Sequence, residues 1–200
     1  MEKGTMELTR KTRKAYDFAQ KAHEGQVRKG SMTPYFTHPE AVGYLLAEYT
    51  DDEDVISAGF LHDVLEDTEG YDRNDMAQDF GSRVADIVNH VSHQDEKKFT
   101  KEEKRELWKK RKQDYIDHLE SAPFEALMVS AADKIHNLET MGEKYLKDGE
   151  SMWKIFNAPE PQKENVIWFY EEVLNKLKKR LDNPIVIRLQ RAVSGFTNSR

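Results

Sequence analysis

Apolar residues recur at helical spacing along most of the chain. In segment 9–24, Ala15, Phe18, Ala19 and Ala22 follow the i, i+3, i+4, i+7 spacing that buries one face of a helix. Comparable patterns predict further helices over the following segments: 39–49, 55–65 after an Asp51 or Asp52 cap, 74–80, 82–91, 101–119, 123–137 and 166–181. Apart from the short stretch 185–187, no run of β-branched residues competes with these assignments. The sequence therefore predicts an all-α fold.

Two segments lack this periodicity and are predicted to be loops. Segment 25–34 is interrupted by glycine and proline, and it carries Arg28 and Lys29 at its centre. Segment 92–100 has no regular apolar pattern, which predicts an exposed connection. The first loop is basic within an acidic chain, so it is a candidate site for an anionic ligand.

Length and composition narrow the class of protein. At 200 residues the chain predicts a single domain over residues 1–200, with a core at about 9–181 and a C-terminal helical extension at 182–200. No apolar run approaches the roughly 20 residues needed to cross a bilayer, and the N-terminus does not resemble a secretory signal. We therefore expect a cytoplasmic protein that makes no membrane contact.

Charge and cysteine content exclude several functions. The formal charge is 31 − 37 = −6, which argues against extended nucleic-acid binding, because such binding needs many phosphate contacts from Lys and Arg. The chain has no cysteine, so disulfides, thiol nucleophiles and thiolate metal ligands are excluded. Any metal must be held by histidine and carboxylate side chains.

A cluster of titratable residues within a mainly apolar segment is the strongest chemical signal. His62, Asp63, Glu66 and Asp67 fall within six residues, flanked by Phe60, Leu61, Val64 and Leu65. On a helix these side chains would gather near one edge. Three carboxylates so close would repel one another and raise their pKa values unless a cation lay among them. The cluster therefore predicts a divalent metal site.

Further ligands are needed, and two candidates stand out elsewhere in the chain. His38 immediately precedes Pro39, which steers it away from helical backbone angles. Asp133 places a charge in the middle of a predicted helix among small residues. Together with His62 and Asp63 they form a set of two histidines and two carboxylates, which suits Mn, Fe or Zn better than Ca or Mg.

Five ordered blocks carry a resemblance to a known family: 23–29, 34–39, 58–68, 80–81 and 132–138. With these blocks the chain resembles the HD superfamily of metal-dependent phosphohydrolases. Within it, the chain is most similar to the hydrolase domain of the Rel/Spo alarmone enzymes and their small stand-alone relatives. The resemblance extends over most of the chain.

This resemblance implies an activity and a role for each matching residue. His38, His62, Asp63 and Asp133 would bind one catalytic manganese, while Glu66 and Asp67 would position or deprotonate the attacking water. Arg28 would stack on the guanine, Lys29 would lie beside the phosphates, and Asn137 would contact the ribose. The implied reaction removes pyrophosphate from the 3′ position of (p)ppGpp and leaves GDP or GTP.

The chain departs from the Rel/Spo pattern in two places, and other functions stay open. Glu139 stands where those enzymes commonly have arginine, and segment 92–112 differs from theirs. One alternative is hydrolysis of another phosphorylated nucleotide, such as a deoxynucleotide monophosphate or a phosphorylated dinucleotide cofactor. A second is a non-catalytic nucleotide sensor or partner-binding protein that uses segment 92–112. Self-association through the C-terminal helices is a further expectation, with a monomer as the alternative.

Overall fold

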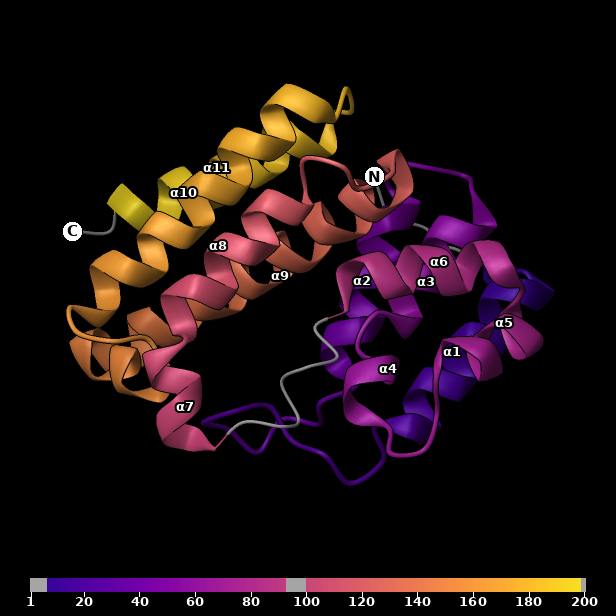
Figure 1. Ribbon diagram of the computed structural model, residues 1–200, viewed down its shortest axis with the longest axis horizontal. Coiled ribbons are helices and arrows are strands. Elements are labelled where there is room, and N and C mark those ends of the chain that lie inside the picture. Colours follow the sequence, from indigo (N-terminus) through magenta and orange to yellow (C-terminus); the bar gives the residue numbers. More distant parts are fainter. Residues whose placement is uncertain (1–6, 93–99, 199–200) are drawn as a thin grey trace. The chain divides into compact units, whose positions relative to one another are not determined.

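The computed structural model describes residues 7–92 and 100–198 as two compact units, with the boundary after Ser92. Residues 93–99 of the predicted exposed segment lie outside the described residues. The helices of each unit can be followed by colour in Figure 1, from indigo to magenta in the first and from pink to yellow in the second. The prediction of one HD-type domain over residues 1–200 stays a prediction.

The first unit, residues 1–92, is built around its third helix. Every residue from Val55 to Leu61 is buried, and this helix packs against α1, α2 and α6. Asp52 caps it by accepting a hydrogen bond from the Asp54 backbone N–H at 3.0 Å. The helices of the unit are α1 (Arg10–Ala22), α2 (Thr37–Ala47), α3 (Glu53–Leu61), α4 (Val64–Asp67), α5 (Arg73–Phe80) and α6 (Ser82–Val91).

The second unit, residues 93–200, has a long helix at its centre. This helix, α9, has eleven buried residues and packs against α10, α11 and the following 3-10 helix. The helices are α7 (Lys101–Glu106), α8 (Trp108–His118), α9 (Phe124–Asp148), η2 (Gly149–Ile155), α10 (Gln162–Arg180) and α11 (Ile185–Asn198). None of the helices in the described ranges is both long and apolar enough to span a bilayer.

The predicted all-α class is confirmed. Within residues 7–92 and 100–198 there is no strand, and the one β-type pairing is an isolated bridge between Val27 and Pro34. Stretch 185–187, the exception noted in the sequence, is helical because Ile185, Leu189 and Val193 form a buried stripe at four-residue spacing. Burial along a helix face thus outweighs the local preference of β-branched residues.

Three helix boundaries differ from the predictions. The predicted helix over 55–65 is two helices, with His62 and Asp63 at the joint. The predicted helix over 101–119 breaks at Leu107, which separates the exposed charged turn of α7 from α8, where Trp108, Tyr115 and Ile116 are buried. The helix predicted over 123–137 continues to Asp148, because Leu138 and Met141 extend its buried face.

Candidate metal centre

A close contact between two helices of the first unit positions the candidate ligands. Gly43 of α2 faces Gly59 of α3, and a Cβ atom on Gly59 would lie only 3.2 Å from the Gly43 Cα. A Cβ on Gly43 would overlap the ring of Phe60, with Cζ at 2.6 Å. The two helices can approach this closely because neither residue has a side chain. The approach brings His38, in the first turn of α2, to His62, at the end of α3.

The two imidazoles face each other in the interior of this unit. Their Nε2 atoms are 3.2 Å apart, and the rings are nearly perpendicular at a centroid distance of 5.0 Å. His38 and His62 are only 2% and 5% exposed. The Nδ1 of His62 lies 2.9 Å from the Gly59 carbonyl oxygen, which can only accept, so Nδ1 donates the hydrogen bond. In the neutral ring, Nε2 of His62 therefore carries the lone pair that a metal would use.

Asp63 adds a carboxylate to this pair. Its Oδ1 lies 3.2 Å from Nε2 of His62, and its Oδ2 lies 3.8 Å from Nε2 of His38. Asp63 is the N-cap residue of α4, but its side chain makes no capping hydrogen bond. The carboxylate is instead directed to the imidazoles, and its Oδ2 accepts a hydrogen bond from the Tyr35 hydroxyl at 2.8 Å.

The chemistry of these donors fits a divalent cation. The lone pair on Nε2 of His62 and the Oδ1 of Asp63 are both acceptors, and they lie 3.2 Å apart in a mostly buried setting. Two acceptors at this distance repel unless a proton or a cation lies between them. Imidazole nitrogen with carboxylate oxygen is a donor set typical of Mn, Fe and Zn. The residues of the first unit therefore fit a metal ion of this group.

Tyr35 is protected from ionisation in this setting. Burial of the phenol raises its pKa far above the ordinary value, and the nearby carboxylates of Asp63 and Asp67 raise it further. The neutral phenol is thereby favoured, and its hydroxyl donates a hydrogen bond to Oδ2 of Asp63. Tyr35 belongs to one of the family-like blocks, and its place three residues before His38 is the only sign of this contact in the sequence.

The two carboxylates predicted to handle water lie on the next helical turn. Glu66 and Asp67 belong to α4, where Glu66 is half-buried and the Asp67 side chain is 35% exposed. The Oδ2 of Asp67 is 3.8 Å from Nδ1 of His23. Both residues thus follow directly after the ligand pair His62 and Asp63, and α4 presents them at a partly open surface.

The basic loop folds back on itself beside Tyr35. The Arg28 backbone N–H donates to the Thr33 carbonyl oxygen at 2.9 Å, and Val27 forms a bridge with Pro34. Arg28 is half-buried, and its guanidinium carbon lies 5.6 Å from the centre of the Tyr35 ring. Lys29 is exposed. The loop therefore holds Arg28 on the same tyrosine whose hydroxyl contacts Asp63.

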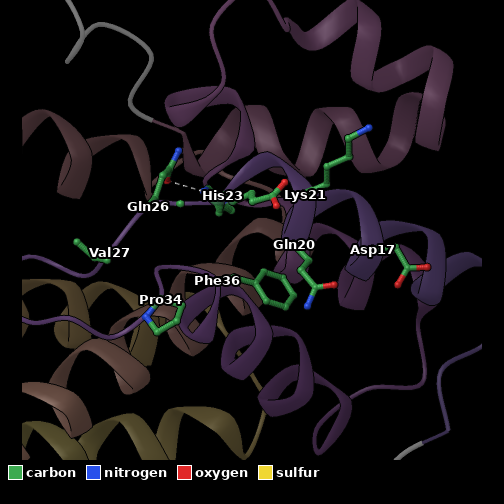
Figure 2. Close-up of a pocket in the computed structure, with 10 residues that line it drawn as sticks. Asp17, Gln20, Lys21, His23, Gln26, Val27, Pro34 and Phe36 are labelled. Carbon is green, nitrogen blue, oxygen red and sulfur yellow. Dashed lines mark hydrogen bonds between the residues drawn. The ribbon is translucent and has the colours of Figure 1, made fainter.

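His23 contacts the start of this loop. Its side chain is fully buried, and its Nδ1 lies 2.9 Å from Oε1 of Gln26, the contact marked in Figure 2. Its Nε2 is buried without a hydrogen-bond partner. A cavity of about 560 Å³ lies beside these residues, bordered by the end of α1, the loop and Phe36. Among the described residues, neither His38 nor His62 lines it.

The second unit contains the remaining predicted site residues, on α9. Both oxygens of Asp133 are engaged: Lys134 forms an ion pair with Oδ2, and the Asn137 amide donates to Oδ1 at 2.5 Å. Lys134 is 8% exposed, and its Nζ lies 4.7 Å from the centre of the Tyr115 ring. Burial lowers the pKa of Lys134, but the Asp133 carboxylate and other nearby groups raise it by more, so this pKa is well above its ordinary value. Asp133 is thus held by a cation that stays charged.

Glu139, the departure noted in the sequence, has a partner in the structure. Arg188 of α11 donates to its Oε1 from both Nε and Nη2, at 3.2 Å in each case. Rel/Spo enzymes commonly have arginine at this position. Here the residue is an acid, and it pairs with an arginine from another helix. The two residues are 49 positions apart, so no local pattern in the sequence indicates that they form a pair.

Comparison with known proteins decides the family. The sequence profile described as "HD domain" matches residues 15–155 of the chain. The chain belongs to the HD domain family. This confirms the family predicted from the ordered blocks that contain His38, His62, Asp63 and Asp133.

Named relatives and solved structures narrow the comparison within this HD domain family. The bifunctional (p)ppGpp synthase/hydrolase SpoT of Escherichia coli K12 is 39% identical over 135 residues, which are 66% of this chain and 18% of that protein. A GTP pyrophosphokinase of Streptomyces coelicolor is 39% identical over 138 residues, 69% of this chain and 15% of that protein. The chain thus spans less than a fifth of the length of these two curated relatives.

A structural neighbour matches nearly the whole length of the chain. It is described as a metazoan ortholog of SpoT that hydrolyzes ppGpp and plays a role in starvation responses. It has a TM-score of 0.73 and 25% sequence identity, and the match covers 95% of this chain and 97% of that one. The HD fold and the similarity to SpoT-type proteins are therefore supported by both sequence and structure.

Proposed function

We propose that this HD domain protein hydrolyses guanosine 3′,5′-bis(diphosphate) and its 5′-triphosphate form at the 3′ position. One water is consumed, the bond between the 3′ oxygen and the adjacent phosphorus breaks, and pyrophosphate leaves GDP or GTP behind. The observation that carries the proposal is the close approach of the His38, His62 and Asp63 side chains, with ligand atoms 3.2–3.8 Å apart in the first unit.

The proposed ligand set is His38, His62, Asp63 and Asp133, with manganese as the ion and iron or zinc as alternatives. Three members lie in one unit at the distances given above. Asp133 is assigned as the fourth from the family resemblance. The charge on Lys134 and the Asn137 amide both favour the ionised form of this carboxylate, which is the form that binds a metal.

When bound, such a metal lowers the pKa of a water from about 16 toward 7 and polarises a phosphoryl oxygen. The residues of the chain itself position the attacking water and accept its proton. Glu66 accepts a proton from the attacking water or orients it. Asp67, which is more exposed on α4, helps to position the same water. Neither is proposed as a ligand, so both remain available for proton transfer.

Substrate recognition is assigned to the basic loop and to α9. Arg28 presents a flat cation, already resting on the Tyr35 ring, to the face of the guanine. Lys29 is exposed and offers a point charge to the phosphates. Asn137 contacts the ribose. These groups supply local positive charge and polarity to a polyanionic substrate despite the net negative charge of the chain.

The names of the relatives include both synthesis and hydrolysis of (p)ppGpp, so the choice of hydrolysis needs a separate argument. SpoT is named for synthesis and hydrolysis, and the Streptomyces protein for synthesis. The structural neighbour described as hydrolysing ppGpp is matched over 97% of its length. The metal-binding chemistry of the first unit also serves water activation. Both observations favour hydrolysis by the matched region.

A nucleotide panel tests this proposal. Manganese-loaded protein is incubated separately with ppGpp, a deoxynucleotide monophosphate and a phosphorylated dinucleotide cofactor, and released pyrophosphate and phosphate are measured. We expect pyrophosphate from ppGpp in stoichiometric yield with GDP. Turnover of another nucleotide without any from ppGpp would replace the proposed substrate. Tight nucleotide binding without turnover of any of them would favour the sensor function instead.

Two substitutions test the assigned roles in the same assay. Asp63→Ala should lose both bound manganese and activity, because it removes a ligand. Glu66→Gln should retain manganese but lose rate by about 100-fold or more, the usual contribution of a positioned acid or base. Glu69→Gln is the matched control, since Glu69 is an exposed acid three residues farther along. An unchanged rate in Glu66→Gln would remove Glu66 from the mechanism.

A further inference from the structure

Tyr35 is the residue at which the candidate metal centre and the basic loop meet. Its hydroxyl donates to Oδ2 of Asp63 at 2.8 Å. One side of its ring contacts the His23 imidazole at a centroid distance of 4.9 Å, and the Arg28 guanidinium carbon lies 5.6 Å from the ring centre. The His38 ring stands edge-on to it at 6.3 Å. All these residues belong to the first unit.

The backbone around Tyr35 is fixed on both sides. Its N–H donates to the Gln26 carbonyl oxygen at 2.9 Å, which ties it to the first arm of the basic loop. Its carbonyl oxygen accepts from the His38 N–H at 2.9 Å, which ties it to the first turn of α2. The backbone of Tyr35 is therefore held at a defined place relative to the backbone of His38.

The hydrogen bond from Tyr35 makes the two carboxylate oxygens of Asp63 different from each other. Oδ2 is held by Tyr35, whereas Oδ1 lies nearer to Nε2 of His62, at 3.2 Å against 3.8 Å between Oδ2 and Nε2 of His38. A carboxylate with one oxygen fixed cannot rotate freely about its terminal bond. The free rotation that a metal ion would otherwise have to remove on binding is thus already restricted.

We propose that Tyr35 is a positioning residue that orients the Asp63 carboxylate toward the metal through its hydroxyl. This inference rests on the proposed metal site and goes beyond it by assigning a role to a residue outside the proposed ligand set. The ring has a separate task, since it supports Arg28 whether or not the hydroxyl is present. Removing the oxygen alone should therefore affect metal binding and leave recognition of the nucleotide base intact.

The test compares two tyrosine-to-phenylalanine variants in the full chain. Tyr35→Phe removes the hydroxyl that contacts Asp63. Tyr16→Phe is the matched control, because the Tyr16 hydroxyl also donates to a carboxylate, Oε1 of Glu40 at 2.7 Å, but Glu40 is not a proposed metal ligand. Each protein is stripped with a chelator, its thermal unfolding is recorded, and its manganese affinity is measured by titration calorimetry.

We expect the two stripped variants to unfold at similarly lowered temperatures, because each loses one partly buried hydrogen bond. Only Tyr35→Phe should bind manganese more weakly, by about 10- to 100-fold, the usual effect of losing a group that orients a ligand. At saturating manganese its KM for ppGpp should equal that of the unchanged protein. Those results together support the inference.

Three outcomes would overturn it. Manganese affinity in Tyr35→Phe that equals or exceeds that of the unchanged protein would show that the hydroxyl does not position Asp63. An equal loss in Tyr16→Phe would show a general effect of weakened packing. Absence of manganese binding by the unchanged protein would remove the metal site itself, a failure of the proposed function that the calorimetry separates from the first two.

Discussion

The contact between α2 and α3 can be tested by adding a single methyl group. In Gly43→Ala the new Cβ would overlap Cδ1 and Cε1 of the Phe60 ring and lie 2.6 Å from its Cζ. Phe60 is completely buried, and the rings of Tyr16 and Tyr44 flank it at centroid distances of 5.5 and 5.7 Å. The ring has no room to move aside, so the two helices must separate.

The expected magnitude combines two opposing effects. Overfilling a packed core costs about 1–3 kcal/mol, and three ring atoms in conflict place this position near 3. Replacing a helical glycine by alanine gains about 1 kcal/mol in backbone entropy and propensity. The net loss in free energy of unfolding is therefore about 2 kcal/mol. For a chain of this length that corresponds to a fall of about 4–8 °C in Tm.

The control is Gly142→Ala, at a helical glycine that has open space around it. Gly142 lies in α9, and a Cβ there would meet nothing within 4 Å. This variant gains the propensity term alone, so its Tm should rise by about 2–4 °C. Circular dichroism melts of the metal-free proteins measure both shifts. If Gly43→Ala matched or exceeded the unchanged protein in Tm, the argument that these glycines allow the close approach would be refuted.

Three further predictions concern stability. Hydrogen bonds from Arg83 hold the pKa of Asp52 below its ordinary value of 3.8, so this stabilisation is present above about pH 4 and is lost as the pH falls through the lower folded pKa. Asp52→Asn should therefore unfold more easily than the unchanged protein at neutral pH in urea titrations but equal it in strong acid. Arg180→Met loses two charged hydrogen bonds, to the Leu119 and Ala122 carbonyl oxygens, and should lower the free energy of unfolding by about 2 kcal/mol. The control Arg191→Met, at an exposed position of α11, should change it by about zero, and equal losses in the two variants would contradict this. Manganese at 100 times its Kd should stabilise the stripped protein by about 2.7 kcal/mol in a thermal melt and leave Asp63→Ala unaffected.

Much of the fold could be predicted because single helices depend on local patterns. The apolar spacing around Ala15 and Ala19 and the cap at Asp52 are visible in the sequence, and the corresponding helices begin close to the predicted residues. The break after Leu61 was missed. Apolar periodicity continues through Leu65 on both sides of the joint, so nothing in the pattern marks the change in direction.

The candidate ligands could be named from the sequence, but the contacts that hold them in place could not. His38, His62 and Asp63 are unusual residue types for their apolar surroundings, which is a signal that survives without coordinates. The Gly43 and Gly59 contact and the Tyr35 hydroxyl bond join residues 16 and 28 positions apart. Glycine and tyrosine are ordinary residues in such segments, so only the tertiary structure reveals what they contact.

The interruption between α3 and α4 bears on how two neighbours in sequence would bind one ion in the proposed metal centre. Successive side chains on an unbroken α-helix leave the axis about 100° apart. His62 is the C-cap residue of α3 and Asp63 is the N-cap residue of α4, and at this joint the Nε2 of His62 and the Oδ1 of Asp63 lie 3.2 Å apart. Adjacent ligands lose little chain entropy when they converge, since no loop must close between them. A residue inserted at this joint would therefore damage the centre more than a longer insertion in the loop at 25–34.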